Sequence, residues 1–187
     1  PTRHESGVAG VMNMFDEPEI KQGRKGMGSH QSASMLKDEW LTPPEIIDAL
    51  GGPLSFDLDP CAPIKRPWPT ARFHFNISDN GLLQKWSGRI WLNPPYGGPN
   101  IVGPWMRRMV DHGSGTVLIF ARTETALFFE TVWHKATALL FLEGRLYFYH
   151  VDGKRAAANA GAPSVLIAYG GQDAEILRNC GIAGQYV

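Results

Sequence analysis

The chain has 187 residues, of which 43% are hydrophobic, and its 18 basic residues balance its 18 acidic ones. This length fits one domain of ordinary size, and zero net charge excludes a general nucleic-acid binder that depends on a strongly basic surface. The two cysteines, Cys61 and Cys180, form no CxxC pair and no Cys/His cluster with zinc-ligand spacing. We therefore expect a reducing compartment and no metal. Because no apolar run approaches the roughly 20 residues that span a bilayer, and no basic-then-apolar leader is seen, we expect a cytoplasmic protein with no membrane partner.

Residues 1–37 differ in composition from the rest of the chain. They are rich in Gly, Met, Ser and Gln and show no apolar periodicity. This composition predicts a flexible N-terminal arm, with an arm that orders on nucleic acid as the alternative. Globular patterning begins next, so we expect a single domain over residues 38–187.

Strands and helices alternate along this domain. In chain order the apolar patterns predict a helix over 43–50, a strand over 54–58, an irregular proline-rich segment over 60–81, a strand over 89–92, a helix over 101–112, a strand over 115–121, a helix over 123–134, strands over 136–142, 146–151 and 164–169, and a helix over 173–179. Thr42 and Thr123 are the expected N-caps of the first and third helices. The alternation predicts an α/β domain with a mostly parallel central sheet flanked by helices.

Two short segments follow predicted strands directly. Residues 59–62 come after the first strand, and residues 93–96 come after the next clear one. Ligands in open α/β sheets bind beyond the carboxyl ends of the strands. We therefore expect both segments at the functional edge of the sheet.

The second segment combines stiffness with hydrogen-bond acceptors. Its four residues are Asn93, Pro94, Pro95 and Tyr96. The prolines fix φ and remove two N–H donors, the Asn93 side chain and the Pro94 backbone offer carbonyls, and Tyr96 offers a flat ring. Two acceptors on the protons of a planar –NH2 group favour the tetrahedral nitrogen of an alkylation transition state. The loop thus predicts a pocket for a planar amine, and by itself leaves open which amine is bound.

Residues 93–96 resemble the catalytic motif of amino-group methyltransferases. Three upstream segments, 40–45 (WLTPPE), 56–62 (FDLDPCA) and 78–83 (SDNGLL), occur in the order typical of DNA adenine-N6 methyltransferases. With this match over residues 38–98, the chain resembles the compact S-adenosylmethionine-dependent enzymes of bacteriophage and prophage origin. The resemblance implies a Rossmann-like class I methyltransferase fold. The short spacing from Asp59 to Asn93 implies that the fold is trimmed, with one strand–helix unit lost or replaced by the proline-rich segment.

The resemblance also implies roles for individual residues. Asn93 and Pro94 would bind the target amine and Tyr96 would stack on a flipped adenine, with Pro95 completing the catalytic motif. The implied S-adenosylmethionine contacts are Trp40, Thr42, Pro43, Asp57, Asp59, Pro60, Cys61, Ala62 and Asp79. Two of these carboxylates have an alternative structural reading: Asp57 as a buried or capping group and Asp79 as an Asx-turn residue. The chain departs from the family at 63–65, where Pro-Ile-Lys replaces a glycine-rich turn.

Double-stranded DNA is the partner that the resemblance implies. Candidate phosphate contacts are Lys65, Arg66, Arg72, Arg107, Arg108, Arg122, Arg145, Lys154 and Arg155. Lys154 and Arg155 lie in a glycine-bounded loop over 153–161, the expected mobile DNA-contacting loop. Two alternatives remain open. One is an amino-group methyltransferase acting on RNA or a protein glutamine, and the other is a catalytically decayed scaffold used as a binding protein, which the departure at 63–65 favours.

Overall fold

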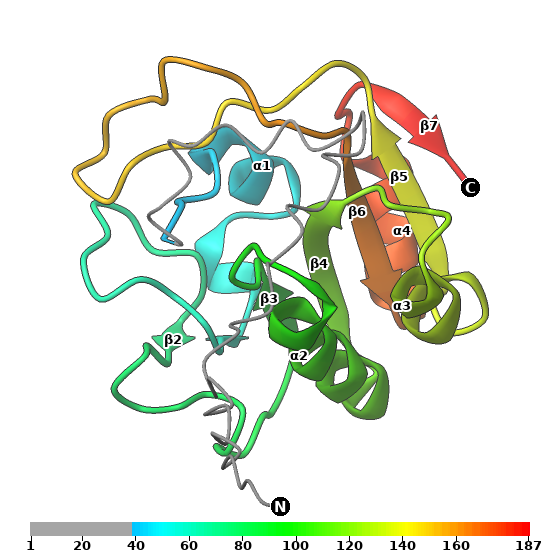
Figure 1. Ribbon diagram of the computed structural model, residues 1–187, viewed down its shortest axis with the longest axis horizontal. Coiled ribbons are helices and arrows are strands. Elements are labelled where there is room, and N and C mark those ends of the chain that lie inside the picture. The colour runs from blue at the N-terminus through cyan, green and yellow to red at the C-terminus, as the bar shows by residue number, and fades with distance from the viewer. Residues whose placement is uncertain (1–38) are drawn as a thin grey trace, which may run out of the picture. The chain divides into compact units, whose positions relative to one another are not determined.

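The computed structural model describes residues 39–187 (Figure 1). The arm predicted over residues 1–37 lies outside the described residues. The described part is a mixed α/β structure built on one sheet of seven strands. The α/β class predicted from the alternation of strands and helices is therefore confirmed.

The seven strands lie in the order β2-β1-β3-β4-β6-β5-β7. Their bounds are β1 Leu58–Asp59, β2 Phe73–His74, β3 Ile90–Leu92, β4 Gly115–Phe120, β5 Ala138–Leu142, β6 Ser164–Tyr169 and β7 Gly184–Tyr186. Strands β1 to β5 run in one direction, and β6 and β7 run in the other. Since β6 lies between β4 and β5, only the β2-β1-β3-β4 half of the sheet is parallel in its pairing.

Helices cover both faces of the sheet, because apolar side chains alternate along its strands. One face packs against α1 (Pro44–Ala49) and α4 (Gly171–Asn179), and the other against α2 (Pro99–His112), α3 (Ala126–Phe128) and the π-helix η2 (Phe129–Trp133). In β4, Leu118 belongs to the first core, whereas Val117 and Ile119 belong to the second. Figure 1 shows α2 beside β3 and β4.

Several predicted boundaries are wrong. Residues 54–58 were expected to form a strand, but Pro53–Ser55 forms the 3₁₀ helix η1, and only the end of the segment joins the sheet as β1. The expected N-caps are also displaced, because Pro43 precedes α1 without a side-chain cap and Thr125, not Thr123, caps α3. Thr125 Oγ1 accepts a hydrogen bond from the Phe128 N–H at 3.3 Å. Proline thus begins α1 through its fixed φ alone.

The strand predicted over 146–151 is wrong, and the two edge strands, β2 and β7, were not predicted. The backbone of Tyr149 makes isolated bridges to Leu41 and Arg155 instead of joining the sheet. Strand β2 lies inside the proline-rich segment that was expected to be irregular, and it pairs in parallel with β1. The connection from β1 to β2 contains no helix, so the proline-rich segment supplies a strand without its usual crossover helix.

Candidate active site

The direction in which the chain adds successive strands to the sheet reverses between β1 and β3. From β1 the chain moves outward to β2, whereas from β3 it moves to β4 on the other side. The carboxyl ends of two such strands diverge and leave a crevice, which is where ligands bind in open α/β sheets. Residues 60–62 follow β1 and residues 93–96 follow β3. The two segments that the sequence placed at strand ends therefore meet at the switch point.

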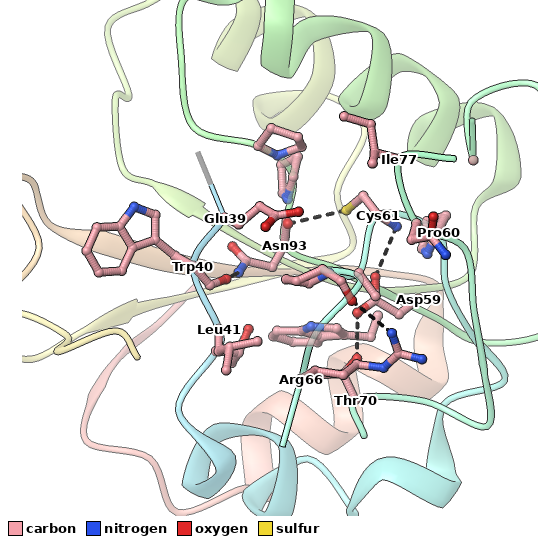
Figure 2. A pocket seen from close by; sticks show the side chains of 18 of the residues that line it. Glu39, Trp40, Leu41, Asp59, Pro60, Cys61, Arg66, Thr70, Ile77 and Asn93 are labelled. Carbon is pink, nitrogen blue, oxygen red and sulfur yellow. Dashed lines mark hydrogen bonds between the residues drawn. The ribbon is translucent and has the colours of Figure 1, made fainter. Parts of the chain in front are cut away.

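A cavity of about 440 Å³ opens at this switch point. Its volume lies within the range of small-molecule sites in proteins. Ten of the predicted site residues line it: Trp40, Thr42, Asp59, Pro60, Cys61, Ala62, Asn93, Pro94, Pro95 and Tyr96. Figure 2 shows Glu39, Cys61 and Asn93, from the 39–41 segment, the loop after β1 and the loop after β3, lying close together at this cavity, whereas the Trp40 ring points away from them. The cavity therefore joins the predicted cofactor loop to the predicted catalytic loop.

Three predicted cofactor residues, all within the described range, do not line the cavity: Pro43, Asp57 and Asp79. Asp57 Oδ2 accepts a hydrogen bond from the Arg89 N–H at 2.8 Å. Asp79 Oδ2 accepts one from the Asn76 N–H at 2.9 Å. Both carboxylates therefore bond nearby backbone N–H groups outside the cavity.

The cavity also has lining residues to which the sequence assigned no cofactor or catalytic role, and one of them, Arg66, was expected to contact phosphate instead. They are Glu39, Leu41, Pro63, Arg66, Trp68, Thr70, Asn76, Ile77, Asn80, Gly81, Trp91 and Trp105. Ile77 is 80% exposed although it is apolar, and Asn80 adopts a positive φ of 51°. A Cβ atom at Gly81 would collide with the Pro60 carbonyl. The 76–81 loop therefore packs directly on the loop after β1 and closes one end of the cavity.

The amide of Asn93 is held at both ends. Its Nδ2 donates to the Trp40 carbonyl at 3.3 Å, and its Oδ1 accepts from the Tyr96 hydroxyl at 3.0 Å. Burial raises the pKa of Tyr96, so this hydroxyl stays protonated and remains a donor. Carbonyl oxygens have two lone pairs, so Asn93 Oδ1 keeps one acceptor site for a ligand.

Tyr96 is fixed against the core on the side of β4 and the loop after β5. Its ring centroid lies 4.5 Å from that of Phe120 and 5.5 Å from that of Phe148. Aromatic pairs at these distances are favourable beyond the area they bury. The ring is therefore a rigid part of the cavity wall.

Cys61 connects the two loops. Its thiol donates to the Asn93 carbonyl at 3.3 Å, and its backbone N–H donates to Asp59 Oδ1 at 3.1 Å (Figure 2). Burial raises the pKa of the thiol well above its ordinary value. A protonated thiol is a weak donor and a poor nucleophile, so Cys61 serves as a link between the loop after β1 and the loop after β3.

Asp59 is a buried carboxylate with two hydrogen-bond donors, and the charge of Arg66, which lies nearby without forming an ion pair, lowers its pKa only in part. Thr70 Oγ1 donates to its Oδ2 at 2.5 Å, and the Cys61 N–H donates to its Oδ1. Burial raises its pKa to about 6 in spite of these hydrogen bonds. No ion pair among residues 39–187 includes Asp59. Because an unpaired buried charge is costly, a cationic ligand in the cavity would offset this cost.

The basic side chains differ in whether their charge is already neutralised by an acidic neighbour. Arg107 on α2 forms a bidentate pair with Glu130 at 2.6 and 2.9 Å. Arg155 lies over the Tyr147 ring at 4.0 Å from its centroid, and Lys154, whose side chain is 83% exposed, lies 3.5 Å from Asp152. Arg107 is thus the least suited of the predicted phosphate contacts, whereas the 147–155 loop keeps two basic side chains near the surface.

No helix over residues 39–187 is long and apolar enough to cross a membrane. Within the same range, no group of three or more His, Cys, Asp and Glu side chains has a geometry that could hold a metal ion.

Comparison with known proteins gives one family and one curated relative. The family described as DNA N-6-adenine-methyltransferase (Dam) matches residues 29–177. The DNA N-6-adenine-methyltransferase of Escherichia phage T1 is 24% identical over 151 residues. That match covers 78% of this chain and 62% of the relative, so the chain spans less than two thirds of the relative's length. No solved structure matches the chain.

Proposed function

Because the chain belongs to the family of DNA N-6-adenine-methyltransferases (Dam), we propose that it transfers a methyl group from S-adenosylmethionine to the N6 amine of a flipped adenine in double-stranded DNA. Membership confirms the resemblance drawn from the four sequence segments. The observation that carries the proposal is the convergence of Asp59 and Asn93 on one cavity at the switch point of the sheet. A buried anion and a planar-amine acceptor there suit a cationic methyl donor beside an exocyclic amine.

The sheet supports a Rossmann-like class I fold as the fold of this enzyme. Strand order reverses between β1 and β3, helices lie on both faces, and the cavity lies beyond the carboxyl ends of these strands. These are the features of doubly wound sheets that bind nucleotide-like ligands. The missing helix between β1 and β2 is the trimmed part.

The residues present fit S-adenosylmethionine. Asp59 would face its ammonium or sulfonium group, and Trp40, Thr42 and the 60–62 loop would surround it. The Gly81–Pro60 contact closes the loop after β1 without the glycine-rich turn of the family. When bound, the cofactor supplies an electrophilic methyl group on sulfur.

The catalytic loop prepares the amine for attack. Asn93 Oδ1, which keeps one free lone pair, and the Pro94 carbonyl would accept the two protons of the adenine amine. These bonds draw the nitrogen toward a tetrahedral geometry, in which its lone pair is free and the developing positive charge is stabilised. Transfer of the methyl group would leave S-adenosylhomocysteine as the product, and the alkylated nitrogen would then lose a proton to solvent, so no base is needed beforehand. Tyr96, held by Phe120 and Phe148, would stack on the base.

Cofactor binding is expected to depend on pH through Asp59. In the free protein its pKa of about 6 lies above the ordinary 3.8, so the folded state binds this proton more tightly and the free energy of unfolding falls as pH rises from about 4 to 6. A cationic ligand favours the ionised form and expels the proton. We expect affinity for S-adenosylmethionine to fall by up to about tenfold per pH unit below pH 6.

Titration calorimetry between pH 5 and 8, in two buffers of different ionisation enthalpy, measures the affinity for S-adenosylmethionine and the number of protons released on binding. We expect protons to be released on binding near pH 6. The Asp59→Asn variant should bind more weakly at pH 7 and show neither proton release nor pH dependence between pH 5 and 7, below the range in which the α-amino group of the cofactor titrates. An affinity of the unaltered protein that stays constant from pH 5 to 7, together with an unchanged affinity in Asp59→Asn, would rule out a cation against Asp59.

The 147–155 loop is the proposed DNA contact. Its backbone turns back on itself, because the His150 N–H donates to the Lys154 carbonyl and the Ala156 N–H donates to the Phe148 carbonyl. The turn presents Lys154 and Arg155 together. Basic side chains on such a turn would neutralise phosphates and make binding salt-dependent.

Transfer of an isotopically labelled methyl group tests the proposed reaction. DNA duplexes, RNA and a glutamine-rich peptide are offered to the protein with labelled S-adenosylmethionine. We expect label in duplex DNA alone, on N6 of adenine. Label in RNA or peptide would support the other amino-group substrates. Calorimetry that detects neither S-adenosylmethionine nor S-adenosylhomocysteine binding would support a decayed scaffold.

A further inference from the structure

We propose that Trp68 is a positioning residue for the catalytic amide, acting through the backbone of residues 40–42. The proposal rests on the function assigned to Asn93 above. Trp68 lies in the proline-rich segment, where the sequence offered no motif. It lines the cavity, but its polar atom is directed at backbone: Nε1 donates to the Thr42 carbonyl at 3.2 Å.

The segment 40–42 needs such a tie, because the orientation of Asn93 depends on it. Asn93 Nδ2 donates to the Trp40 carbonyl, two residues before the carbonyl that Trp68 holds. Because the NH2 end of the amide is bound to the Trp40 carbonyl, its oxygen must point away from that carbonyl. If the 40–42 backbone shifts, the amide loses its only partner for Nδ2 among residues 39–187 and is free to rotate, so its oxygen no longer faces the amine in one orientation.

A second element holds the same segment through backbone hydrogen bonds. Leu41 and Tyr149 exchange two backbone hydrogen bonds, at 2.8 and 3.1 Å. The Tyr149 ring meets the Trp68 ring edge-on, with centroids 5.3 Å apart. Trp68 and Tyr149 therefore form a clamp, defined by these two residues, on residues 40–42.

The clamp also links the proposed DNA contact to the amide. Gly153, at φ +84°, allows the turn of the 147–155 loop to pack on Pro67, since a Cβ atom there would lie 3.1 Å from Pro67 Cγ. Phe148 packs against Tyr96 at 5.5 Å, and its neighbour Tyr149 belongs to the clamp. Arg155 pairs with Tyr149 through an isolated backbone bridge. From Tyr149, one path of contacts leads through residues 41 and 40 to Asn93, and another leads through Phe148 to Tyr96. A DNA backbone bound at Lys154 and Arg155 would therefore be connected to both catalytic side chains.

Trp68→Phe tests the proposal, because it removes the indole N–H and keeps an aromatic ring against Tyr149. We expect kcat at saturating cofactor and DNA to fall about five- to tenfold, which is what the loss of one oriented hydrogen bond produces. The cofactor Kd should change less than kcat does. Trp133→Phe is the matched control, because Trp133 Nε1 also donates to a backbone carbonyl, that of Thr123 at 3.0 Å, but neither of these residues lines the cavity. Its kcat should match the unaltered protein.

A nuclear magnetic resonance measurement tests the same point without activity. The side-chain amide of Asn93, assigned by its disappearance in Asn93→Asp, should exchange slowly with solvent in the unaltered protein and in Trp133→Phe, and quickly in Trp68→Phe. Unchanged exchange and unchanged kcat in Trp68→Phe would overturn the proposal. If the unaltered protein transfers no methyl group, the proposed function fails, and the exchange measurement still decides whether Trp68 positions Asn93.

Discussion

Asn93→Ala is expected to lower the rate of methyl transfer by about 10² to 10³-fold, the usual cost of removing one group that stabilises charge in a transition state. The Asn93 amide is the element of the cavity that combines a fixed orientation with a free lone pair. Its loss leaves the Pro94 carbonyl as the remaining acceptor for the target amine. Single-turnover transfer of a labelled methyl group to duplex DNA measures the effect.

Cofactor affinity separates this role from a structural one. Asp59 and the loop after β1 remain in Asn93→Ala, so the Kd for S-adenosylmethionine should stay within about threefold of the unaltered value, a change below 1 kcal/mol. Asn179→Ala is the matched control, since the Asn179 side chain bonds only Glu175 at the exposed end of α4. A fully active Asn93→Ala protein would contradict the assigned role.

Asp173→Ala is expected to lower the free energy of unfolding by about 3–5 kcal/mol, because it leaves a buried charge without its partner. Asp173 Oδ1 accepts from Arg89 Nε at 2.9 Å and from Thr116 Oγ1 at 2.6 Å. The two charged side chains are 5% and 1% exposed. Arg89 also lies over the Phe56 ring, 3.8 Å from its centroid, and donates to the Leu50 carbonyl. The pair thus joins α4, β4, the residue before β3 and the end of α1.

Chemical denaturation measures this loss, and Asp111→Ala provides its comparison. Asp111 lies on the exposed face of α2, so removing its carboxylate should change stability by no more than about 0.5 kcal/mol. If Asp173→Ala costs less than 1 kcal/mol, the pair does not anchor the sheet. Asp173→Asn should be the milder change, because an amide oxygen can still accept from Thr116.

Sequence patterns predicted the central elements well, because their apolar periods reflect burial on both faces of the sheet. The strand at Ser164–Tyr169 was predicted with its observed bounds, and α2 begins two residues earlier than expected, at Pro99. The segment 146–151 has the same apolar character, but Tyr149 pairs with Leu41 and Arg155. Pairing between distant segments is a tertiary choice that local propensity does not determine.

The site residues that directly follow a strand could be predicted from the sequence. Those that reach the cavity only through tertiary packing could not. The loops after β1 and β3 converge as the strand-end rule requires. Thr70 and Trp68 act through an irregular proline-rich segment with no periodicity, so no local signal could have found them. Asp57 and Asp79 matched the family by position, yet their carboxylates hold backbone groups, which only the coordinates of their neighbours reveal.

Methyl-sensitive sequencing of DNA from cells that express this chain tests the central claim most directly, because it reports activity, base and sequence context in one measurement. The account predicts N6-methyladenine within a defined sequence context, present with the unaltered chain and absent with Asn93→Ala expressed at the same level. The account would be contradicted if the unaltered chain is folded and binds S-adenosylmethionine in these cells, and yet their genomic DNA contains no more N6-methyladenine than the DNA of the Asn93→Ala cells.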